Sequence, residues 1–492
     1  MKINPHTPVL VAQAQVVQHE DNPANSRGPL HLMEDALRHA AIDAGLTTTP
    51  NADLLHVVRS LSLHETNPGH SLARALGITA RHTTYTPHGG NTPQWLVNQA
   101  ANAIQRGEAD VILLTGGEAM RSRRLARKAG ITPTWFAPQS PNDPTPTPTA
   151  DDFVMNHAAE VALNITLPIE IYPMFETALR ARDGRSIDDH QRRIAALWSR
   201  FANVAASNPH AWSQTAYTAD EIRTPTPRNR MIGFPYTKLM NSNNDVDMAA
   251  ALIVCSAEKA TSLGIPRDRW VFIHAGTDCH EHAFVSHRHT FTDTPAIRLG
   301  GRMALELANT SLDDIDVIDL YSCFPSAVQL GAESLGLSLD QQLTCTGGLS
   351  FAGGPFNNYV MHAIATTITQ LRDGKNQGFI WANGGYATKH SFGIYSTEPP
   401  PDTFKWGSPQ DAIDRLPKRE LLTNTQTDAM IESYSVMHDR DGAPAVVRAS
   451  LLTKNDQRVW AITNDPQTAQ NMCHGEWVGT SAHVTADGTL KP

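Results

Sequence analysis

Histidine, acidic and cysteine side chains gather in one short stretch of the chain, and side chains of these types are the usual ligands of metal ions. The stretch contains His274, His280, His282, His287 and His289, together with Asp278, Cys279 and Glu281. Their spacing differs from that of structural zinc sites, and the stretch mixes strand-like and loop-like segments. The sequence therefore predicts no bound metal.

Thiols are the next candidates for chemistry. The chain has five cysteines, Cys255, Cys279, Cys323, Cys345 and Cys473, and none of them forms a C-x-x-C pair. Cys323 and Cys345 are interpreted as cysteines packed in the core. Scattered cysteines suit a reducing compartment, and the N-terminus shows no charged head followed by an apolar stretch. These features predict a cytoplasmic protein.

Motifs for nucleotide cofactors and for serine nucleophiles are absent. The chain contains no G-x-G-x-x-G, no G-x-x-x-x-G-K-[ST] and no G-x-S-x-G. Its net charge is −9, which argues against a nucleic-acid partner. No apolar run approaches the ~20 residues that a membrane span requires.

The elements that must position any site are repeated along the chain. Residues 34–44 have helical spacing and precede a strand-like segment at 53–58. A second helix-like segment at 300–308 precedes a strand-like segment at 316–321. The two copies lie about 265 residues apart, which indicates an internal duplication.

A second pair of segments repeats at nearly the same distance. Gly89-Gly90 precedes a predicted helix, Gln94 to Arg106, a strand at 110–114 and a further glycine pair. In the other copy Gly353-Gly354 precedes a helix over 359–372, a strand over 378–381 and then Gly384-Gly385. Alternating helices and strands favour a mainly parallel sheet with helices on both faces. We therefore expect two α/β halves that pack against each other.

Composition changes between and after these halves. Residues 132–150 are rich in Pro and Thr, and mainly helical stretches follow to about residue 245. This segment is interpreted as an inserted cap, or alternatively as a plain surface excursion. After a Pro-rich linker the pattern alternates with period two, which predicts a small antiparallel β-barrel, with an OB-like barrel as the best guess. The predicted boundaries are 1–120 with 246–270 for the first half, 121–245 for the cap, 271–398 for the second half, 399–419 for the linker and 420–492 for the barrel.

Several segments, in order, resemble signatures of the thiolase superfamily. Residues 107–119 resemble the strand and turn after the nucleophile helix, and Asp247–Ile253 resembles the D-x-A-A-A-L stretch. Residues 347–355 resemble the G-G-x-x-x-x-G-H-P loop, and Asn383-Gly384-Gly385 resembles the C-x-G loop. The resemblance covers roughly residues 8–395. It implies a five-layer αβαβα fold with reactive loops converging between the halves.

The reactive residues of thiolases are missing from these loops. Counting back from Gln94 places Gly89 where the nucleophilic cysteine of a thiolase stands. Gly354 replaces the histidine base, and Ala382 replaces the acid/base cysteine. A glycine has no nucleophile and an alanine cannot transfer a proton. Acyl transfer through an enzyme-bound thioester is therefore not expected.

Related branches of the superfamily match better at two of the loops. Sterol-carrier-type thiolases carry H-D-C-F where this chain has Tyr321-Ser322-Cys323-Phe324. Thiolase-like steroid side-chain aldolases carry Y-D-x-F there and G-N-G-G-x-x-D-Y-H in the last loop. This resemblance assigns catalytic roles to Tyr321 and His390, with Lys389 in place of the second aldolase tyrosine. The fused tail makes thiolase-like proteins with an additional C-terminal domain the best-matching subfamily.

Cleavage of a C–C bond beside a thioester needs a proton carrier and a means of stabilising the enolate. Tyr321 would carry the proton if Lys389 or His390 lowered its pKa. We expect the backbone N–H groups of Gly89, Gly90, Gly384 and Gly385 to bind the oxyanion, because glycine permits close approach. Further expected substrate-binding residues are Asn91, Asn358 and His362.

Structural interpretations of the same residues stay open. In these interpretations Tyr321 ends a strand with its hydroxyl in water, and Lys389 is a solvated lysine. His390 and His362 would then be core histidines, and Asn357-Asn358 would only cap a helix.

Three functions follow. The first is an enzyme that makes or breaks a C–C bond of an acyl-CoA by aldol-like chemistry, with coenzyme A as part of the substrate and no metal or nucleotide cofactor. The second is a non-catalytic protein that binds CoA or lipid. The third, suggested by similarity alone, is an acetyl-CoA acetyltransferase. The resemblance implies a homodimer, although the tail leaves a monomer open.

Overall fold

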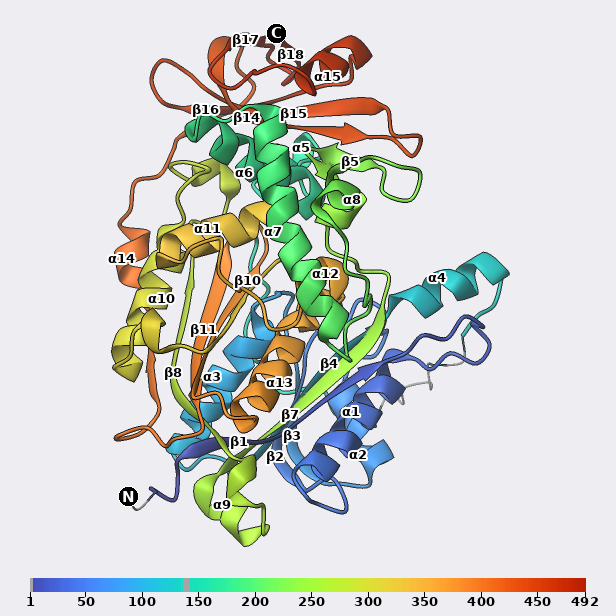
Figure 1. Ribbon diagram of the computed structural model, residues 1–492, viewed down its shortest axis with the longest axis vertical. Helices are drawn as coiled ribbons and strands as arrows, with labels where there is room; N and C mark the ends of the chain where they lie inside the picture. The colour runs from blue at the N-terminus through green and yellow to red at the C-terminus, as the bar shows by residue number, and fades with distance from the viewer. Residues whose placement is uncertain (1–2, 134, 136–141) are drawn as a thin grey trace.

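A computed structural model describes residues 3–133, 135 and 142–492 of the chain. Its largest sheet consists of two half-sheets that meet edge to edge (Figure 1). The first half-sheet has the strand order β3 (Ala80–Tyr85), β2 (Ala52–Val57), β4 (Val111–Ala119), β7 (Asp247–Ser256) and β1 (Pro8–Val17). The second continues with β8 (Val271–His280), β11 (Lys389–Ser396), β10 (Gln377–Gly384) and β9 (Val317–Leu320).

The two half-sheets repeat one pairing pattern, which confirms the duplication. In the first half β4 is parallel to β2 and antiparallel to β7, which is antiparallel to β1. In the second half β10 is parallel to β9 and antiparallel to β11, which is antiparallel to β8. β1 and β8 join the halves through the pairs Val9–Phe272 and Leu10–Val271.

Two helices form the layer between the half-sheets. α3 (Thr92–Gln105) and α13 (Tyr359–Arg372) contact each other and strands of both halves. The helix predicted over 359–372 has the same bounds in the structure. Asn357-Asn358 precede its first residue, and Asp373 follows its last residue. Glycines let the layers approach closely. A Cβ atom on Gly393 of β11 would overlap the side chain of Gln94.

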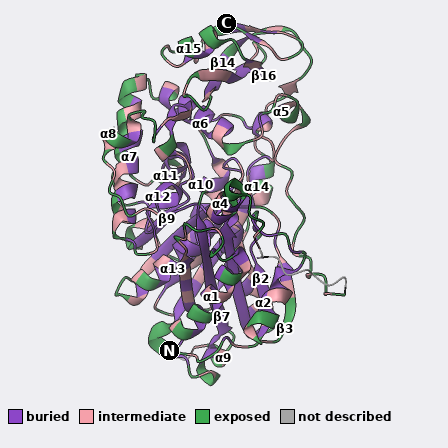
Figure 2. Cartoon of the chain, turned by 90° about the vertical axis from the view of Figure 1, so that its right-hand side faces the viewer, coloured by how far each residue is buried: buried purple, intermediate pink, exposed green. Residues whose placement is uncertain are grey.

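Further helices cover the outer faces. α1 (Pro29–Asp43), α2 (Pro68–Leu76) and α9 (Ala257–Ser262) flank the first half, and α10 (Pro295–Ala308) and α11 (Pro325–Leu335) flank the second. The strands are thereby enclosed; all residues of β7 are buried, and Figure 2 shows the same for much of the sheet. This layered arrangement is the thiolase fold that the sequence predicts.

The segment between the halves is mainly helical. It contains α4 (Met120–Ala129), α5 (Ala158–Ala162), α6 (Pro168–Arg182), α7 (Ile187–Ser207) and α8 (Ala219–Arg223). It also forms a short hairpin of β5 (Met231–Phe234) and β6 (Tyr236–Thr237), which the sequence did not predict. β5 pairs with a strand of the C-terminal sheet, so the insertion and the tail share one sheet.

The C-terminal sheet curls on itself. Its strands are β13 (Leu421–Leu422), β16 (Arg458–Thr463), β15 (Pro444–Leu452), β14 (Thr427–His438), β17 (Ser481–Val484) and β18 (Leu490–Lys491), accompanied by α15 (Pro466–Met472). A bridge between Ile462 and Thr489 brings β16 against β18. The period-two pattern predicted antiparallel strands in this region, and β14, β15 and β16 pair antiparallel there.

The segment predicted as a linker has structure of its own. β12 (Lys405–Gly407) runs parallel to β8, and α14 (Gln410–Asp414) follows it. The indole N–H of Trp406 donates to Asp278 Oδ2 over 2.6 Å. The chain therefore remains attached to the second half until it enters the C-terminal sheet.

Candidate active site between the two halves

An apolar cavity of about 440 Å³ lies where both halves and the insertion meet. Loop 88–90 of the first half lines one side. The other side is lined by residues of the second half, namely Tyr321, Cys323, Phe324, Asn383, Gly385 and Tyr386. The start of α6 and Met155 close it from the insertion. The loops that resemble thiolase signatures therefore converge on one chamber.

Tyr321 faces this chamber directly after β9. Its backbone N–H donates to Trp381 O over 3.1 Å, and its ring packs edge-on against Tyr359 at 5.6 Å. A Cβ atom on Gly90 would lie 2.5 Å from the hydroxyl, so only glycine leaves room for the tyrosine. Burial, and next the nearby Cys323, raise the pKa of Tyr321 above its usual value, opposite to the predicted lowering. The residue is a neutral phenol at neutral pH.

Lys389 reaches the other glycine of the pair. Its Nζ donates to His88 O and lies 2.8 Å from the place of a Cβ atom on Gly89. Burial lowers the pKa of this amine to about 8, an effect that Asp152 partly opposes. Lys389 is not among the described residues that line the chamber. It therefore supports loop 88–90 from behind.

Asn91 and Gly384 belong to the same cluster. The side-chain oxygen of Asn91 lies 2.6 Å from the place of a Cβ atom on Gly89 and 2.7 Å from that on Gly384. Its Nδ2 donates to Ser391 Oγ over 3.3 Å. The structure thus brings together Tyr321, Lys389, Gly89, Gly90, Asn91 and Gly384.

His390 lies on the opposite face of its strand from Lys389, as expected for neighbouring residues in β11. Trp381 Nε1 donates to its Nδ1 over 3.2 Å, and its Nε2 has no hydrogen-bond partner among the described residues. Burial, and next the charge of Arg288, hold its pKa well below the usual value. The structure does not bring His390 to the chamber that Tyr321 lines.

Two predicted substrate-binding residues also lie away from the chamber lining. Asn358 Nδ2 donates to Gly116 O over 2.7 Å, which fixes α13 to the end of β4. His362 contacts Gln15 Oε1 through Nδ1 at 2.9 Å, and burial lowers its pKa to about 3. Both side chains hold the two halves together.

The neighbouring Asn357 does line the chamber, and the sequence gave it no binding role. Its Oδ1 accepts the backbone N–H of Gly89 over 3.0 Å, and its Nδ2 donates to Arg59 O over 2.9 Å. This orientation points Nδ2 at His88 Nδ1, 3.4 Å away. Asn357 therefore links the second half to loop 88–90.

His88 is a second residue that sequence analysis missed. It lines the chamber, and burial, followed by the charge of Arg59, lowers its pKa. Because Asn357 Nδ2 is a donor, Nδ1 of the neutral ring accepts and Nε2 carries the proton. The position beside Gly89 was the available signal, since that glycine marks the reactive loop.

Cys323 lines the chamber as well, although it was interpreted as a core cysteine. It is 7% exposed, and burial raises the pKa of its thiol to about 12. It is a protonated thiol at neutral pH. The Tyr-Ser-Cys-Phe segment that drew attention to Tyr321 was also the signal for this residue.

Backbone groups complete the chamber. The N–H of Gly385 has no hydrogen-bond partner among the described residues, and Gly385 has φ of 71°, which suits glycine. Non-glycine residues at positive φ flank the chamber, namely Phe356 at 45° and Ala387 at 49°. Strained backbone of this kind often accompanies functional sites.

Comparison with known proteins identifies the chain. A family model described as the thiolase-like protein type 1 additional C-terminal domain matches residues 409–489. The crystal structure of a monomeric SCP2-thiolase-like protein type 1 (STLP1) from Mycobacterium smegmatis is 30% identical, with a TM-score of 0.84 and coverage of 98% of each chain. The chain belongs to the STLP1 family. The resemblance and the thiolase fold that the sequence predicts are thereby confirmed.

More distant relatives of this STLP1 family member include proteins named as an acetyltransferase and as an aldolase. An acetyl-CoA acetyltransferase from Methanocaldococcus jannaschii is 23% identical over 241 residues, covering 49% of this chain and 53% of that protein. The chain thus spans about half the length of that curated relative. The Ltp2-ChsH2(DUF35) aldolase structure shares the fold, with 19% identity, a TM-score of 0.59 and coverage of 80% of this chain and 98% of that one.

A second, more polar cavity adjoins the chamber in this STLP1 family member. It has a volume of about 720 Å³ and shares Ile169 and Ser242 with the apolar chamber. Its lining includes the cationic side chains of Arg121, Arg228 and Lys238. Trp212 also lines it, and its ring lies against that of His19, with the centroids 4.2 Å apart and the planes tilted by 34°.

The histidine-rich stretch has no cluster of ligands. His274 bonds to Glu398 O and His280 to Glu281 O through ring nitrogens, each over 2.8 Å. Within the part of the chain that the structure describes, no group of three or more His, Cys, Asp or Glu side chains is placed to hold a metal. Nor do the described residues include a helix long and apolar enough to cross a membrane.

Proposed function

We propose that the protein binds an acyl-CoA thioester and makes or breaks a C–C bond of its acyl group without a covalent cysteine intermediate. The observation that carries this proposal is the Tyr321 hydroxyl, which occupies the space beside Gly90 in the chamber between the halves. A proton-carrying group of the second half thus stands beside Gly90, which has no side chain of its own.

The two adjoining cavities support a CoA thioester as the ligand. The 440 Å³ chamber is apolar enough for an acyl chain, while Arg121, Arg228 and Lys238 suit phosphate groups. Trp212 offers a ring on which an adenine would stack. Relatives named acetyl-CoA acetyltransferase and 3-ketoacyl-CoA thiolase agree with this ligand class.

Tyr321 would exchange a proton with the oxygen on the third carbon of the acyl group. In bond formation the phenol donates to the oxygen of an aldehyde or ketone as that oxygen becomes a hydroxyl. Cleavage needs the tyrosinate to accept the proton of the β-hydroxyl, and the raised pKa of Tyr321 makes the tyrosinate scarce at neutral pH. Bond formation is therefore the direction for which the unliganded site is better prepared.

The thioester oxygen becomes negative as the enolate forms, so it needs hydrogen-bond donors. The free N–H of Gly385 and the Nε2–H of neutral His88 both belong to the chamber lining. Asn357 fixes the tautomer of His88 and so keeps this proton available.

Binding is tested by calorimetry with CoA, decanoyl-CoA and decanoyl-pantetheine. The variant Arg228→Gln with Lys238→Gln should bind both CoA ligands about tenfold more weakly, because charge-assisted bonds to phosphate are lost. Decanoyl-pantetheine lacks these phosphates, and its affinity should not change. Lys405→Gln, which alters a lysine outside both cavities, is the control. Equal affinity of wild type and double variant for CoA would exclude this cavity as the phosphate site.

Non-catalytic binding is the second candidate, and two observations favour it. Lys389 does not line the chamber and His390 faces away from it, so two of the three predicted catalytic side chains do not meet the acyl group. Tight binding of CoA together with no turnover of a panel of β-hydroxyacyl-CoA and β-ketoacyl-CoA thioesters would establish this function.

Acyl transfer is the third candidate, because Cys323 lines the chamber. Its raised thiol pKa leaves little thiolate at neutral pH, which argues against a nucleophilic role. Acetyl label on Cys323 after incubation with acetyl-CoA, absent from Cys323→Ser, would establish it.

A further inference from the structure

The C-terminal sheet holds one loop of the second half through a buried arginine. Arg458 is fully buried and pairs with Glu432 through two hydrogen bonds of 2.7 and 2.9 Å. Its Nη1 donates to the carbonyl oxygens of Val285, Ser286 and Arg288 over 3.1, 2.9 and 2.6 Å. One side chain of the tail therefore fixes the backbone that leads to Arg288.

A tryptophan from the same strand strengthens this attachment. Trp460 Nε1 donates to Ser286 Oγ over 2.8 Å. Ser286 in turn donates its backbone N–H to Glu160 Oε1 over 2.9 Å. The loop is thus held between the tail and helix α5 of the insertion.

Arg288 passes this constraint on to the chamber. It is buried, and its Nη2 donates to Ala387 O over 2.8 Å and to Thr388 Oγ1 over 3.0 Å. Ala387 stands at positive φ, and its N–H donates to Tyr172 Oη over 2.8 Å. The turn over residues 385–388 therefore keeps its conformation through contacts on both sides.

This turn forms part of the chamber wall. Gly385 and Tyr386 line the chamber, and Gly385 carries the unpartnered N–H. A continuous set of contacts among buried groups runs from Arg458 through Arg288 to this wall. Because such groups have no water to replace a lost partner, a change at one end affects the geometry at the other.

We propose that Arg458 and Arg288 are positioning residues through which the C-terminal domain sets the shape of the acyl chamber. The domain would then be an integral part of the site instead of an appended module. The inference deepens the proposed function, since the ligand whose affinity it controls is the acyl thioester of that function.

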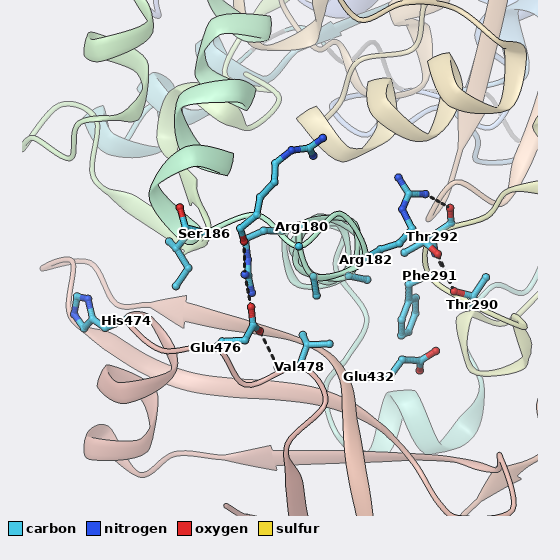
Figure 3. A pocket seen from close by; sticks show the side chains of 15 residues that line it. Arg180, Arg182, Ser186, Thr290, Phe291, Thr292, Glu432, His474, Glu476 and Val478 are labelled. Carbon is cyan, nitrogen blue, oxygen red and sulfur yellow. Dashed lines mark hydrogen bonds and ion pairs between the residues drawn. The ribbon is translucent and has the colours of Figure 1, made fainter.

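A second arginine at the same junction provides a matched control. Arg180 of α6 is 4% exposed and pairs with Glu476 of the C-terminal sheet. Figure 3 shows this pair beside a cavity of about 850 Å³, with Glu432 and Phe291 on another side. Arg180 Nη1 also donates to Arg185 O over 3.1 Å, away from the 385–388 turn. Its removal should loosen the junction without reaching the chamber.

The experiment compares Arg458→Met with Arg180→Met in the full chain by amide hydrogen exchange. Exchange in peptides covering 384–390 should rise about tenfold in Arg458→Met and stay unchanged in Arg180→Met, because only the first variant releases the turn. Glu432→Gln, which keeps side-chain volume, and Trp460→Phe, which removes the indole N–H and part of the ring, should give smaller rises and serve if Arg458→Met does not fold. Equal exchange of this turn in all variants, or an equal rise in Arg180→Met, would overturn the proposal.

Ligand affinity is the second measurement. Decanoyl-CoA should bind about tenfold more weakly to Arg458→Met than to Arg180→Met if the turn shapes the chamber. Arg458→Lys keeps the charge but not the forked geometry, so it should restore only part of the affinity. If wild type binds no acyl-CoA, the proposed function fails, whereas the exchange result still decides the positioning role.

Discussion

The two sides of the chamber contribute different things. Loop 88–91 of the first half contributes one lining side chain, His88, and two glycines, Gly89 and Gly90, that leave room for groups of the other half. The second half contributes Tyr321, whose hydroxyl fills the space beside Gly90, and Lys389, whose Nζ shares the space beside Gly89 with Asn91 Oδ1 of the loop itself. Two halves of one duplicated fold have thus taken unequal roles.

The second glycine pair extends this comparison. A Cβ atom on Gly354, in the repeat position of loop 88–91, would lie 2.8 Å from Asn244 Oδ1. Asn244 comes from the chain that returns from the insertion and lines the chamber. In both halves, therefore, a side chain from another segment occupies the space beside the second glycine of the loop. Loss of a reactive residue has not left an empty site.

The largest expected effect comes from the second half. Tyr321→Phe removes the hydroxyl but keeps the ring, so turnover should fall ~10²–10⁴-fold, as for other general acids. Binding of decanoyl-CoA should change less than about twofold, because the phenyl ring still packs on Tyr359. Steady-state kinetics with a β-hydroxyacyl-CoA and calorimetry measure the two effects. Unchanged turnover would remove the tyrosine from the mechanism.

The next effect tests the first half by giving its loop a side chain. Gly90→Ala places a methyl group against Tyr321 and the carbonyl oxygen of Asn383, so it should cost about 3 kcal/mol in stability. Combining it with Tyr321→Phe should restore only part of the lost stability, because the carbonyl oxygen of Asn383 cannot move away from the methyl group. Urea unfolding measures both, with Gly475→Ala, whose nearest neighbour would lie at 3.1 Å, as the control.

A smaller effect is expected at the contact between the two sides. Asn357→Leu leaves the N–H of Gly89 and the carbonyl of Arg59 without their partners, which should cost about 2 kcal/mol. It also removes the amide donor that fixes which ring nitrogen of His88 carries the proton. Asn358→Leu, measured in the same way, should lower stability but leave ligand affinity unchanged, because Asn358 bonds to Gly116. Similar losses of affinity in both variants would show that Asn357 has no special part in the chamber.

The smallest effect concerns the helices between the half-sheets. His362 of α13 has a pKa of about 3 in the folded protein. In the unfolded chain the imidazole binds a proton with the ordinary pKa of about 6.5, so between these two values only the unfolded chain is protonated at this residue. Its contribution to stability is present above pH 6.5 and is lost as the pH falls toward 3. Between pH 7 and 6 the loss should be less than about 1 kcal/mol. His362→Gln should remove this part of the pH dependence in urea unfolding, and an unaltered dependence would contradict it.

Much of the framework follows from the sequence. The helix over 359–372 and the glycine pairs before both central helices were predicted, because their spacing and turn residues act locally. The orientation of side chains in the loops was harder to predict. Asn357 and Asn358 differ by one position, yet one faces the chamber and the other bonds to Gly116. That choice depends on the tertiary contacts of each loop.

The strand around Lys389 and His390 illustrates a different limit. Neighbouring side chains in a strand point to opposite faces, so Lys389 and His390 cannot both face one chamber. A joint role for this pair is therefore inconsistent with the strand in which both lie. Cys323 was interpreted as a core cysteine and His88 was given no role, because neither occupies a position where thiolases carry a reactive residue. Both lie within two residues of positions that the sequence analysis had already selected.

The pairing of β5 with β14 has a practical consequence for anyone who shortens the chain. Met437 and Val436 lie opposite Gly233 and Phe234, so the hairpin of the insertion ends against the tail. A fragment that stops near residue 400 would expose an unpaired strand edge and the face of α6 that the tail covers. Such a fragment should be prone to self-association, and expression of the first 400 residues alone is a poor route to a thiolase domain.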